Sequence, residues 1–143
     1  MQKVYIDTTV PSAYFDRRTP DRQRQTQEFW RRLPSYEAVL SALVLGEVKD
    51  TPDPRRREDI ERLISDLPVL PITAEAEILA EEYVDRGAIP AKYRDDAIHV
   101  AIAVVHRIPL LASWNFRHLV NVKARRLINL VNAVLDHGQI EIV

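Results

Sequence analysis

The chain has 143 residues, 46% of them hydrophobic, with 20 Lys and Arg against 21 Asp and Glu, only 3 glycines and no cysteine. This length predicts one domain, residues 1–143, with a hydrophobic core that needs no disulfide or metal to hold it. The lack of cysteine excludes disulfide scaffolds, thiolate zinc sites and thiol nucleophiles, and three isolated glycines exclude the glycine-rich loops that bind dinucleotides or ATP.

The first half of the chain alternates short apolar runs with helical patterns. A β-rich run at residues 4–6 ends at Asp7, and Pro11 stands in the first turn of the helix that follows, with the Thr8 and Thr9 hydroxyls as expected caps. Further predicted elements of this half are an arginine-rich helix at 21–32 with one apolar side, a strand at 38–42, a helix at 43–50 and a helix that starts at residue 54.

The second half repeats this alternation. Residues 69–72 predict a strand whose proline suits a sheet edge, and Thr73 caps a helix that stops at Gly87. Residues 93–106 are apolar on almost every side, which predicts a helix buried on most of its surface. The last predicted elements are a strand at 110–112, a helix at 123–137 that Gly138 ends, and a strand at 139–143.

Strands that alternate with helices favour right-handed βαβ units. The predicted fold class is α/β, a three-layer α/β/α sandwich with a mainly parallel central sheet of about five strands. Asp7 interrupts any N-terminal hydrophobic signal, and the longest apolar run, residues 100–105, is far shorter than the roughly 18 residues that span a bilayer. We therefore expect a cytoplasmic protein with no membrane partner.

Polar residues stand where parallel sheets place their ligand sites, beyond the carboxyl ends of the strands. Carboxylates drawn from separate segments to one sheet edge repel one another unless a cation joins them, and oxygen-only clusters suit Mg²⁺ or Mn²⁺. The candidates are Asp7 after the first strand, Glu47 on the helix after the second, Asp96 at the start of the buried helix, and Asn115 after the strand at 110–112.

Each candidate also has a purely structural alternative. Asp7 alone is more often a helix cap than a ligand, Glu47 is equally consistent with a solvated surface glutamate, and Asn115 is most often a turn residue. Asp95 and Asp96 both gain from the helix macrodipole. An unpaired carboxylate beside an apolar helix is costly, however, which singles out Asp96.

Other catalytic arrangements have no support. The four histidines lack the H-E-x-x-H spacing of zinc proteases, and no Gly-x-Ser-x-Gly elbow exists; His99 is predicted to be a packed or hydrogen-bonded helix residue. Clustered arginines are expected on solvated helix faces, where they can also form a positive rim around an acidic centre. These are Arg17, Arg18, Arg22, Arg24, Arg31, Arg32, residues 55–57, Arg125 and Arg126.

Four ordered segments resemble the motifs of PIN domains. They are Val-Tyr-Ile-Asp-Thr-Thr-Val at 4–10, Gly-Glu-Val at 46–48, Asp-Asp-Ala-Ile-His-Val-Ala-Ile-Ala at 95–103, and Leu-Leu-Ala-Ser-Trp-Asn-Phe-Arg-His-Leu at 110–119. Within that group the chain is similar to the VapC-type toxins, which are metal-dependent ribonucleases with an α/β/α fold.

The resemblance implies that Asp7, Glu47 and Asp96 bind the metal, Mg²⁺ or Mn²⁺. Asn115 falls where the family commonly has a fourth aspartate, and it is counted with the three acids among the catalytic residues. Its carbonyl oxygen can still ligate, but one negative charge is lost. We therefore expect weaker binding of a second metal.

The resemblance further implies an endoribonuclease that hydrolyses RNA phosphodiester bonds, the toxin of a type II toxin–antitoxin system. Its expected partners are the RNA substrate, a small cognate antitoxin and a second copy of the chain in a homodimer. The alternative is a PIN-like RNA- or protein-binding module with weakened catalysis, and Asn115 is the reason to keep it.

Overall fold

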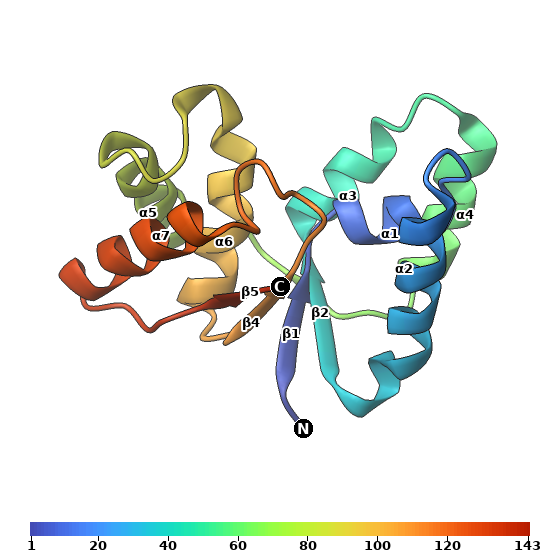
Figure 1. Cartoon of the computed structure of the whole chain (residues 1–143), viewed down its shortest axis with the longest axis horizontal. Coiled ribbons are helices and arrows are strands. Elements are labelled where there is room, and N and C mark those ends of the chain that lie inside the picture. The colour runs from blue at the N-terminus through green and yellow to red at the C-terminus, as the bar shows by residue number, and fades with distance from the viewer.

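The computed structural model describes residues 1–143 and contains five strands and seven α-helices (Figure 1). The strands lie in the order β3-β2-β1-β4-β5, and every neighbouring pair is parallel. The prediction of an α/β fold with a parallel sheet of about five strands is confirmed. The strands are β1 (Lys3–Ile6), β2 (Glu37–Ser41), β3 (Val69–Leu70), β4 (Leu110–Ala112) and β5 (Glu141–Ile142).

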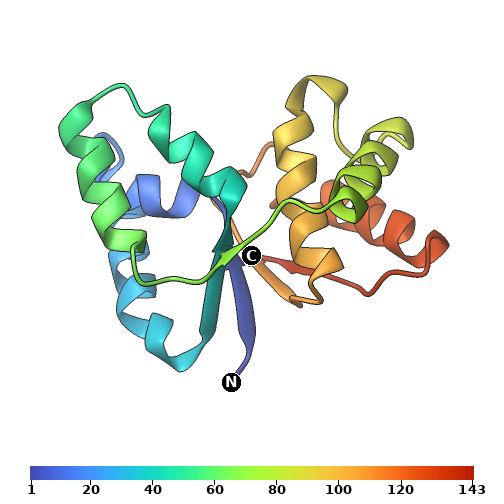
Figure 2. The ribbon, with the colours of Figure 1, turned by 180° about the vertical axis from the view of Figure 1, so that it is seen from behind.

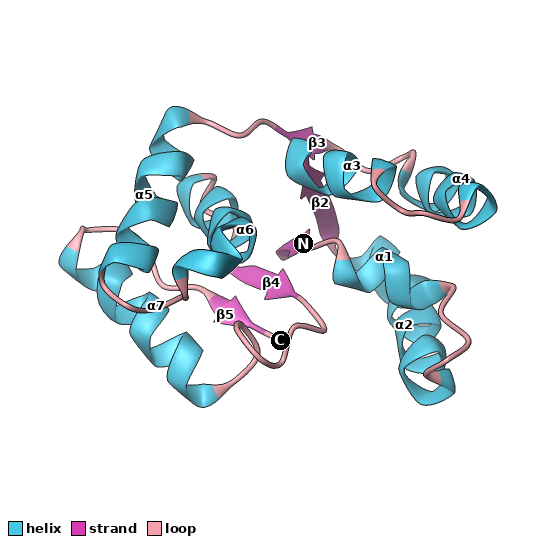
Figure 3. Cartoon of the chain, turned by 90° about the horizontal axis from the view of Figure 1, so that it is seen from above, coloured by secondary structure: helices cyan, strands magenta, loops and turns pink.

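Helices flank the sheet on both sides, as Figures 1 and 3 show. One side carries α1 (Thr9–Tyr14), α2 (Pro20–Arg32), α3 (Ala42–Lys49) and α4 (Pro54–Ile64), and the other carries α5 (Ala74–Asp85), α6 (Arg94–Val105) and α7 (Val122–Val134). Figure 2 shows from behind how the segment after β3 crosses to α5 on the far side. None of the helices combines the length and apolar character needed to cross a membrane.

The side chains of β1 alternate between two apolar clusters, because successive residues of a strand point to opposite faces. Val4 and Ile6 belong to a small cluster with Val10 of α1. Tyr5 belongs to the larger cluster, which includes the buried face of α6. This alternation places β1 between the two helical layers and fixes the direction in which Asp7, the next residue, leaves the sheet.

Helix α6 lies deep in the larger cluster. Residues 99–104 are all buried, with relative exposures of 6% or less. The prediction of a helix enclosed on most of its surface is confirmed. Its first turn, which carries Asp95 and Asp96, is the polar end and lies beside the carboxyl edge of the sheet.

The expected edge strand and its neighbouring helix are also confirmed. β3 pairs only with β2 and ends directly before Pro71. The Thr73 hydroxyl accepts a hydrogen bond from the Ala76 amide at 3.1 Å and caps α5. Gly87, with φ of 79°, takes the left-handed conformation just after α5.

The start of α1 differs from the prediction. The helix begins at Thr9, so Pro11 lies in its first turn as predicted, but no side chain caps it. The Thr8 hydroxyl donates to Glu47 at 2.6 Å and the Thr9 hydroxyl donates to Asp7 at 2.5 Å. These bonds orient both hydroxyls toward the carboxylates, and hydrogen bonds to a charged acceptor are about twice as strong as neutral ones.

The end of α7 also differs. The helix stops at Val134 instead of continuing to His137. Asp136 takes the left-handed conformation, with φ of 62°, which aspartate tolerates better than most residues. The chain therefore turns before Gly138, and the final strand is the two-residue β5 rather than residues 139–143.

The position of β4 between β1 and β5 yields a stability prediction. Leu111 is fully buried in β4, so Leu111→Ala is expected to lower the free energy of unfolding by about 2–5 kcal/mol through lost burial and an unfilled cavity. Urea denaturation measures this. The matched control is Leu130→Ala on α7, where the side chain is 59% exposed; equal effects of the two substitutions would contradict this placement of β4.

Candidate active site

The carboxyl ends of β1 and β4 form the point where the order of the sheet reverses. From β1 the chain builds outward through β2 and β3, then returns to add β4 on the other side of β1. A crevice opens at such a point because the connections leave in opposite directions. Ile6 pairs with Ala112, so the next residues, Asp7 and Ser113, lie side by side at this crevice.

Asp7 is buried, with 2% of its surface exposed. Its Oδ1 accepts hydrogen bonds from the Thr9 amide at 3.0 Å and the Thr9 hydroxyl at 2.5 Å, and its Oδ2 accepts one from the Ser113 hydroxyl at 2.5 Å. Burial raises the pKa of Asp7 above its ordinary value, although the charge of His99 and these hydrogen bonds oppose the rise. A buried carboxylate of this kind gains from any nearby positive charge.

Glu47 is held by hydrogen bonds that begin in the core. Its Oε1 accepts from the Thr8 hydroxyl at 2.6 Å and lies 2.5 Å from His99 Nε2. His99 Nδ1 lies 2.7 Å from the Tyr5 hydroxyl, which lies 2.8 Å from Ser41 Oγ. Both contacts of Glu47 use Oε1, which leaves Oε2 free for a ligand.

Glu47 and His99 shift one another's proton equilibria. Burial alone raises the pKa of Glu47, but the hydrogen bond and charge of His99 outweigh it and lower the pKa. Burial alone lowers the pKa of His99, but the hydrogen bond to Glu47 and the charges of Asp7, Glu47 and Asp96 raise it. Both directions favour an imidazolium–carboxylate pair. The prediction of a hydrogen-bonded His99 is confirmed, and the Glu47 side chain is partly solvated, with 31% of its surface exposed.

Asp96 is the third acid at this edge. It is half-buried while the adjacent Asp95 is exposed, because neighbouring residues of a helix point about 100° apart. Burial raises the pKa of Asp96, the Asn115 side chain lowers it, and the negative charge of Glu47 raises it further. Asp96 therefore lies in the same electrostatic environment as Glu47.

Asn115 lies in the loop between β4 and α7. Its Oδ1 accepts a hydrogen bond from the His118 amide at 3.0 Å, and its own amide donates to Ser113 Oγ at 2.9 Å. The donor to Ser113 is the backbone N–H of Asn115, and both contacts are those of a turn residue. The same side chain also neighbours Asp96, so this turn residue lies at the edge where the candidate acids are.

The four predicted site residues reach one edge of the sheet, but no three acidic or histidine side chains lie close enough to share a metal ion. Hydroxyl groups and His99 occupy carboxylate oxygens instead. The donor set still fits a hard divalent cation, because it consists of three carboxylates and an amide oxygen. Binding an ion requires the carboxylates to turn toward one another.

A polar pocket of about 400 Å³ opens beside these acids. Its lining includes Thr8, Glu47 and three arginines, namely Arg18, Arg22 and Arg56. Other arginines of α2 pair with acids on the helix surface, as Arg31 does with Glu28. Only part of the arginine set thus forms a rim at the acidic site, and the rest is solvated.

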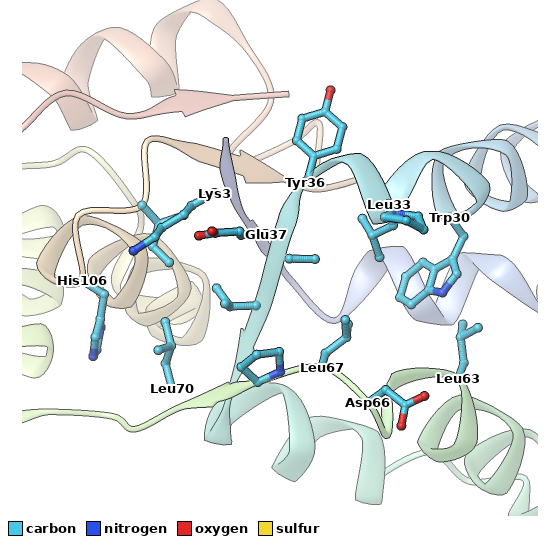
Figure 4. A pocket seen from close by; sticks show the side chains of 15 residues that line it. Lys3, Trp30, Leu33, Tyr36, Glu37, Leu63, Asp66, Leu67, Leu70 and His106 are labelled. Carbon is cyan, nitrogen blue, oxygen red and sulfur yellow. The ribbon is translucent and has the colours of Figure 1, made fainter. Parts of the chain in front are cut away.

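A different pocket, of about 770 Å³, lies at the opposite end of the sheet. Figure 4 shows Trp30 and Leu67 on one side of β2, and Lys3 with His106 on the other. Lys3 and Glu37 open β1 and β2, so this cavity is at the amino ends of the strands. It brings no pair of hydrogen-bonded titratable side chains together, and we do not place chemistry there.

The contacts of Tyr5, Ser41 and Ser113 at the candidate site were not predicted from the sequence. The sequence positions of Tyr5 and His99 do indicate that these two residues lie near the candidate acids. Tyr5 lies two residues before Asp7 and shares its face of β1. His99 lies three residues after Asp96 and shares its face of α6. Counting along β1 and α6 in this way could have added Tyr5 and His99 to the candidate site.

Comparison with known families identifies the chain. The model of the PIN domain matches residues 4–120, and the chain belongs to the PIN domain family. Comparison with curated proteins gives no significant match.

Solved structures with a similar fold come from three other bacteria. The Mycobacterium tuberculosis toxin VapC20, which cleaves the sarcin–ricin loop, is 21% identical over 76% of this chain and 86% of its own, with a TM-score of 0.58. Rickettsia felis VapBC2, bound to a DNA fragment from its promoter, is 11% identical over 81% and 90%, with a TM-score of 0.58. Neisseria gonorrhoeae FitAcB is 15% identical over 87% and 92%, with a TM-score of 0.60. At these identities the likeness shows the fold.

Proposed function

We propose that the protein is a Mg²⁺- or Mn²⁺-dependent endoribonuclease that acts in the cytoplasm as the toxin of a type II toxin–antitoxin pair. The observation that supports this proposal is that Asp7, which follows β1, Glu47 of α3 and Asp96 of α6 all lie toward the carboxyl edge of the sheet in a PIN domain. A toxin that cleaves RNA among the similar structures supports it.

Asp7, Glu47 and Asp96 would hold the cation. When bound, it lowers the pKa of a water molecule and stabilises the charge that develops on the phosphate oxygens. Ser113 and Thr9 keep Asp7 oriented, and His99 does the same for Glu47.

Asn115 stands beside Asp96 in place of a fourth carboxylate: its side-chain N–H group donates to Asp96, while its amide oxygen accepts from the His118 amide. The site therefore carries one negative charge less than a four-acid site, and RNA phosphate meets less repulsion there. The arginine rim attracts the phosphate backbone to the same edge. A small antitoxin that covers this edge would block both interactions, and we propose such a partner together with a homodimer of the chain.

The direct test is cleavage of a structured RNA by the purified protein with Mn²⁺. Cleavage is expected to stop when a chelator removes the metal, and Asp96→Asn is expected to lower its rate by roughly 10²-fold. Asp95→Asn, at the exposed neighbour, should leave the rate unchanged. Equal cleavage by the Asp96 variant and the unmodified protein would contradict the proposal.

A second candidate is a PIN-like binding module that has lost catalysis. Two observations favour it: Asn115 replaces an acid, and the acids are not gathered closely enough for one ion. Titration calorimetry with Mg²⁺ and Mn²⁺ separates the two functions. No heat of binding at millimolar metal would support the binding module, whereas binding that Asp7→Asn abolishes would support the nuclease.

A further inference from the structure

Two pockets meet at Trp114, next to the proposed catalytic acids. One is the polar pocket of about 400 Å³ that contains Arg22 and Arg56. The other, about 290 Å³, is mainly apolar and lies between α2 and the segment after β4. Its lining reaches Ser113, which donates to Asp7. A ligand spanning both pockets would therefore lie against the acidic site.

The Trp114 ring is a fixed wall between these pockets. Its indole Nε1–H donates to the Thr26 hydroxyl of α2 at 2.9 Å, and its backbone amide donates to the Thr9 hydroxyl at 2.8 Å. Thr26 is itself buried and donates to the Arg22 carbonyl. Ring and backbone are thus anchored to different elements, so the ring keeps its orientation without a ligand.

Phe116 extends this wall into solvent. Its ring packs edge-on against Trp114 with centroids 5.8 Å apart, yet 51% of its surface is exposed. The Arg22 guanidinium lies 5.0 Å from the Trp114 ring centroid and 5.7 Å from that of Phe116. A guanidinium stacked on rings keeps its in-plane N–H groups free to bind an anion.

The arginines of the polar pocket are available to a ligand. Arg22 and Arg56 form no ion pair with any acid, whereas Arg18 pairs with Asp16 and so neutralises the one carboxylate of the pocket other than Glu47. Arg56 donates only to the Phe15 carbonyl, at 3.2 Å. Two guanidinium groups that form no ion pair thus line the pocket.

We propose that these pockets together form a subsite for one unpaired nucleotide of the RNA, a proposal that rests on the proposed ribonuclease function. The base enters the apolar pocket against Trp114 and Phe116, and a flanking phosphate binds Arg22 and Arg56 in the polar pocket. A base can stack on a protein ring only when it has left its own helix. The enzyme therefore selects RNA that is single-stranded at the cleaved position.

The combination of the two pockets favours a nucleotide over other ligands. A nucleotide carries a flat apolar face and an anion a few bonds apart, which matches a rigid aromatic wall bordered by free guanidinium groups. The pockets also adjoin Asp7 and Glu47, where the scissile phosphate must come. The competing occupant is an acidic, aromatic segment of a protein partner, and RNA-binding measurements on variants of the two pockets distinguish it from a nucleotide.

The test measures binding of a short, fluorescently labelled single-stranded RNA by anisotropy, in EDTA so that no cleavage occurs. Phe116→Ala and Arg22→Ala are each expected to weaken binding about tenfold, while Phe116→Tyr keeps it. Arg24→Ala is the matched control, because Arg24 lies on the same helix but pairs with Asp21. An RNA duplex should bind weakly, with no dependence on Phe116.

The possible results separate this subsite from the cleavage activity. Aromatic-dependent binding without cleavage in Mn²⁺ would remove the proposed hydrolysis and keep the subsite. Metal-dependent cleavage with RNA binding unchanged in Phe116→Ala and Arg22→Ala would overturn the subsite and assign the pockets to a protein partner. Equal binding of single-stranded and duplex RNA would overturn it as well. Thermal melting of each variant verifies that the exposed substitutions leave the fold intact.

Discussion

Asp7→Asn is expected to lower RNA cleavage by roughly 10²–10³-fold and to leave the protein as stable as before, or more stable. The carboxylate is buried, and burial raises its pKa above the ordinary 3.8. The folded state therefore disfavours the charged form at neutral pH, and removing the charge relieves that cost. Function would thus be lost without any loss of folding.

The pH dependence of stability tests the same reasoning. For an acid whose folded-state pKa is raised, the unfolded state releases its proton first, so ionisation destabilises the fold as the pH rises above about 3.8. The stability gained by Asp7→Asn should therefore be small at acidic pH and larger at neutral pH in thermal melts. Asp95→Asn, at an exposed acid, is the control. Unfolding of the Asp7 variant at all pH values would show that Asp7 serves the fold instead of the chemistry.

His99→Phe is expected to reduce Mn²⁺ affinity and cleavage by about 10–100-fold, the usual effect of losing a group that orients a ligand. The substitution keeps a ring in the buried space but removes the contacts to Glu47 and to Tyr5. It leaves the Tyr5 hydroxyl with Ser41 as its only partner. We expect a loss of about 1–3 kcal/mol in unfolding free energy for the unpaired groups.

Three comparisons make the His99 result specific. His99→Gln, which can bond one partner but not both, should fall between the Phe variant and the unmodified protein in Mn²⁺ affinity by calorimetry. His106→Gln, on the same helix but bonded only to the Ile102 carbonyl, should have no effect. Unchanged Mn²⁺ affinity in His99→Phe would show that Glu47 does not depend on this histidine.

The stabilising part of His99 should also depend on pH. Its pKa is raised above 6.5, so the stabilisation is fully present below pH 6.5 and is lost as the pH rises through the folded-state value. Denaturation at acidic and alkaline pH should therefore show the larger destabilisation by His99→Phe at the acidic end.

Most of the sheet could be predicted from the sequence, because its strands are apolar runs with clear boundaries. In a parallel α/β fold, the run before Asp7 can only be a buried strand and the apolar segment of α6 can only be a buried helix. The element ends were predicted less well. Thr8 and Thr9 have the right identity and position to cap α1, and only the three-dimensional structure shows that their hydroxyls donate to Glu47 and Asp7 and that neither caps the helix.

The candidate acids were also found from the sequence, since they follow strands or open a buried helix. The hydrogen bonds that hold these acids in place were not found from the sequence. His99 bonds Glu47 across 52 positions, and Ser113 bonds Asp7 across 106. Neither contact leaves a local pattern, because both arise when β4 and α6 join the sheet. The positions of the arginines were predicted only as a set, since ion pairing on α2 decides which remain available.

The reversal of strand order at β1 also bears on when the protein becomes active during its synthesis. Asp7 is translated at the start of the chain, but its partner Ser113 and the neighbour of Asp96, Asn115, come after more than three-quarters of it. Until β4 has left the ribosome and paired with β1, the crevice has only one wall. If the protein hydrolyses RNA as proposed, we expect a growing chain to have no activity until β4 has paired with β1.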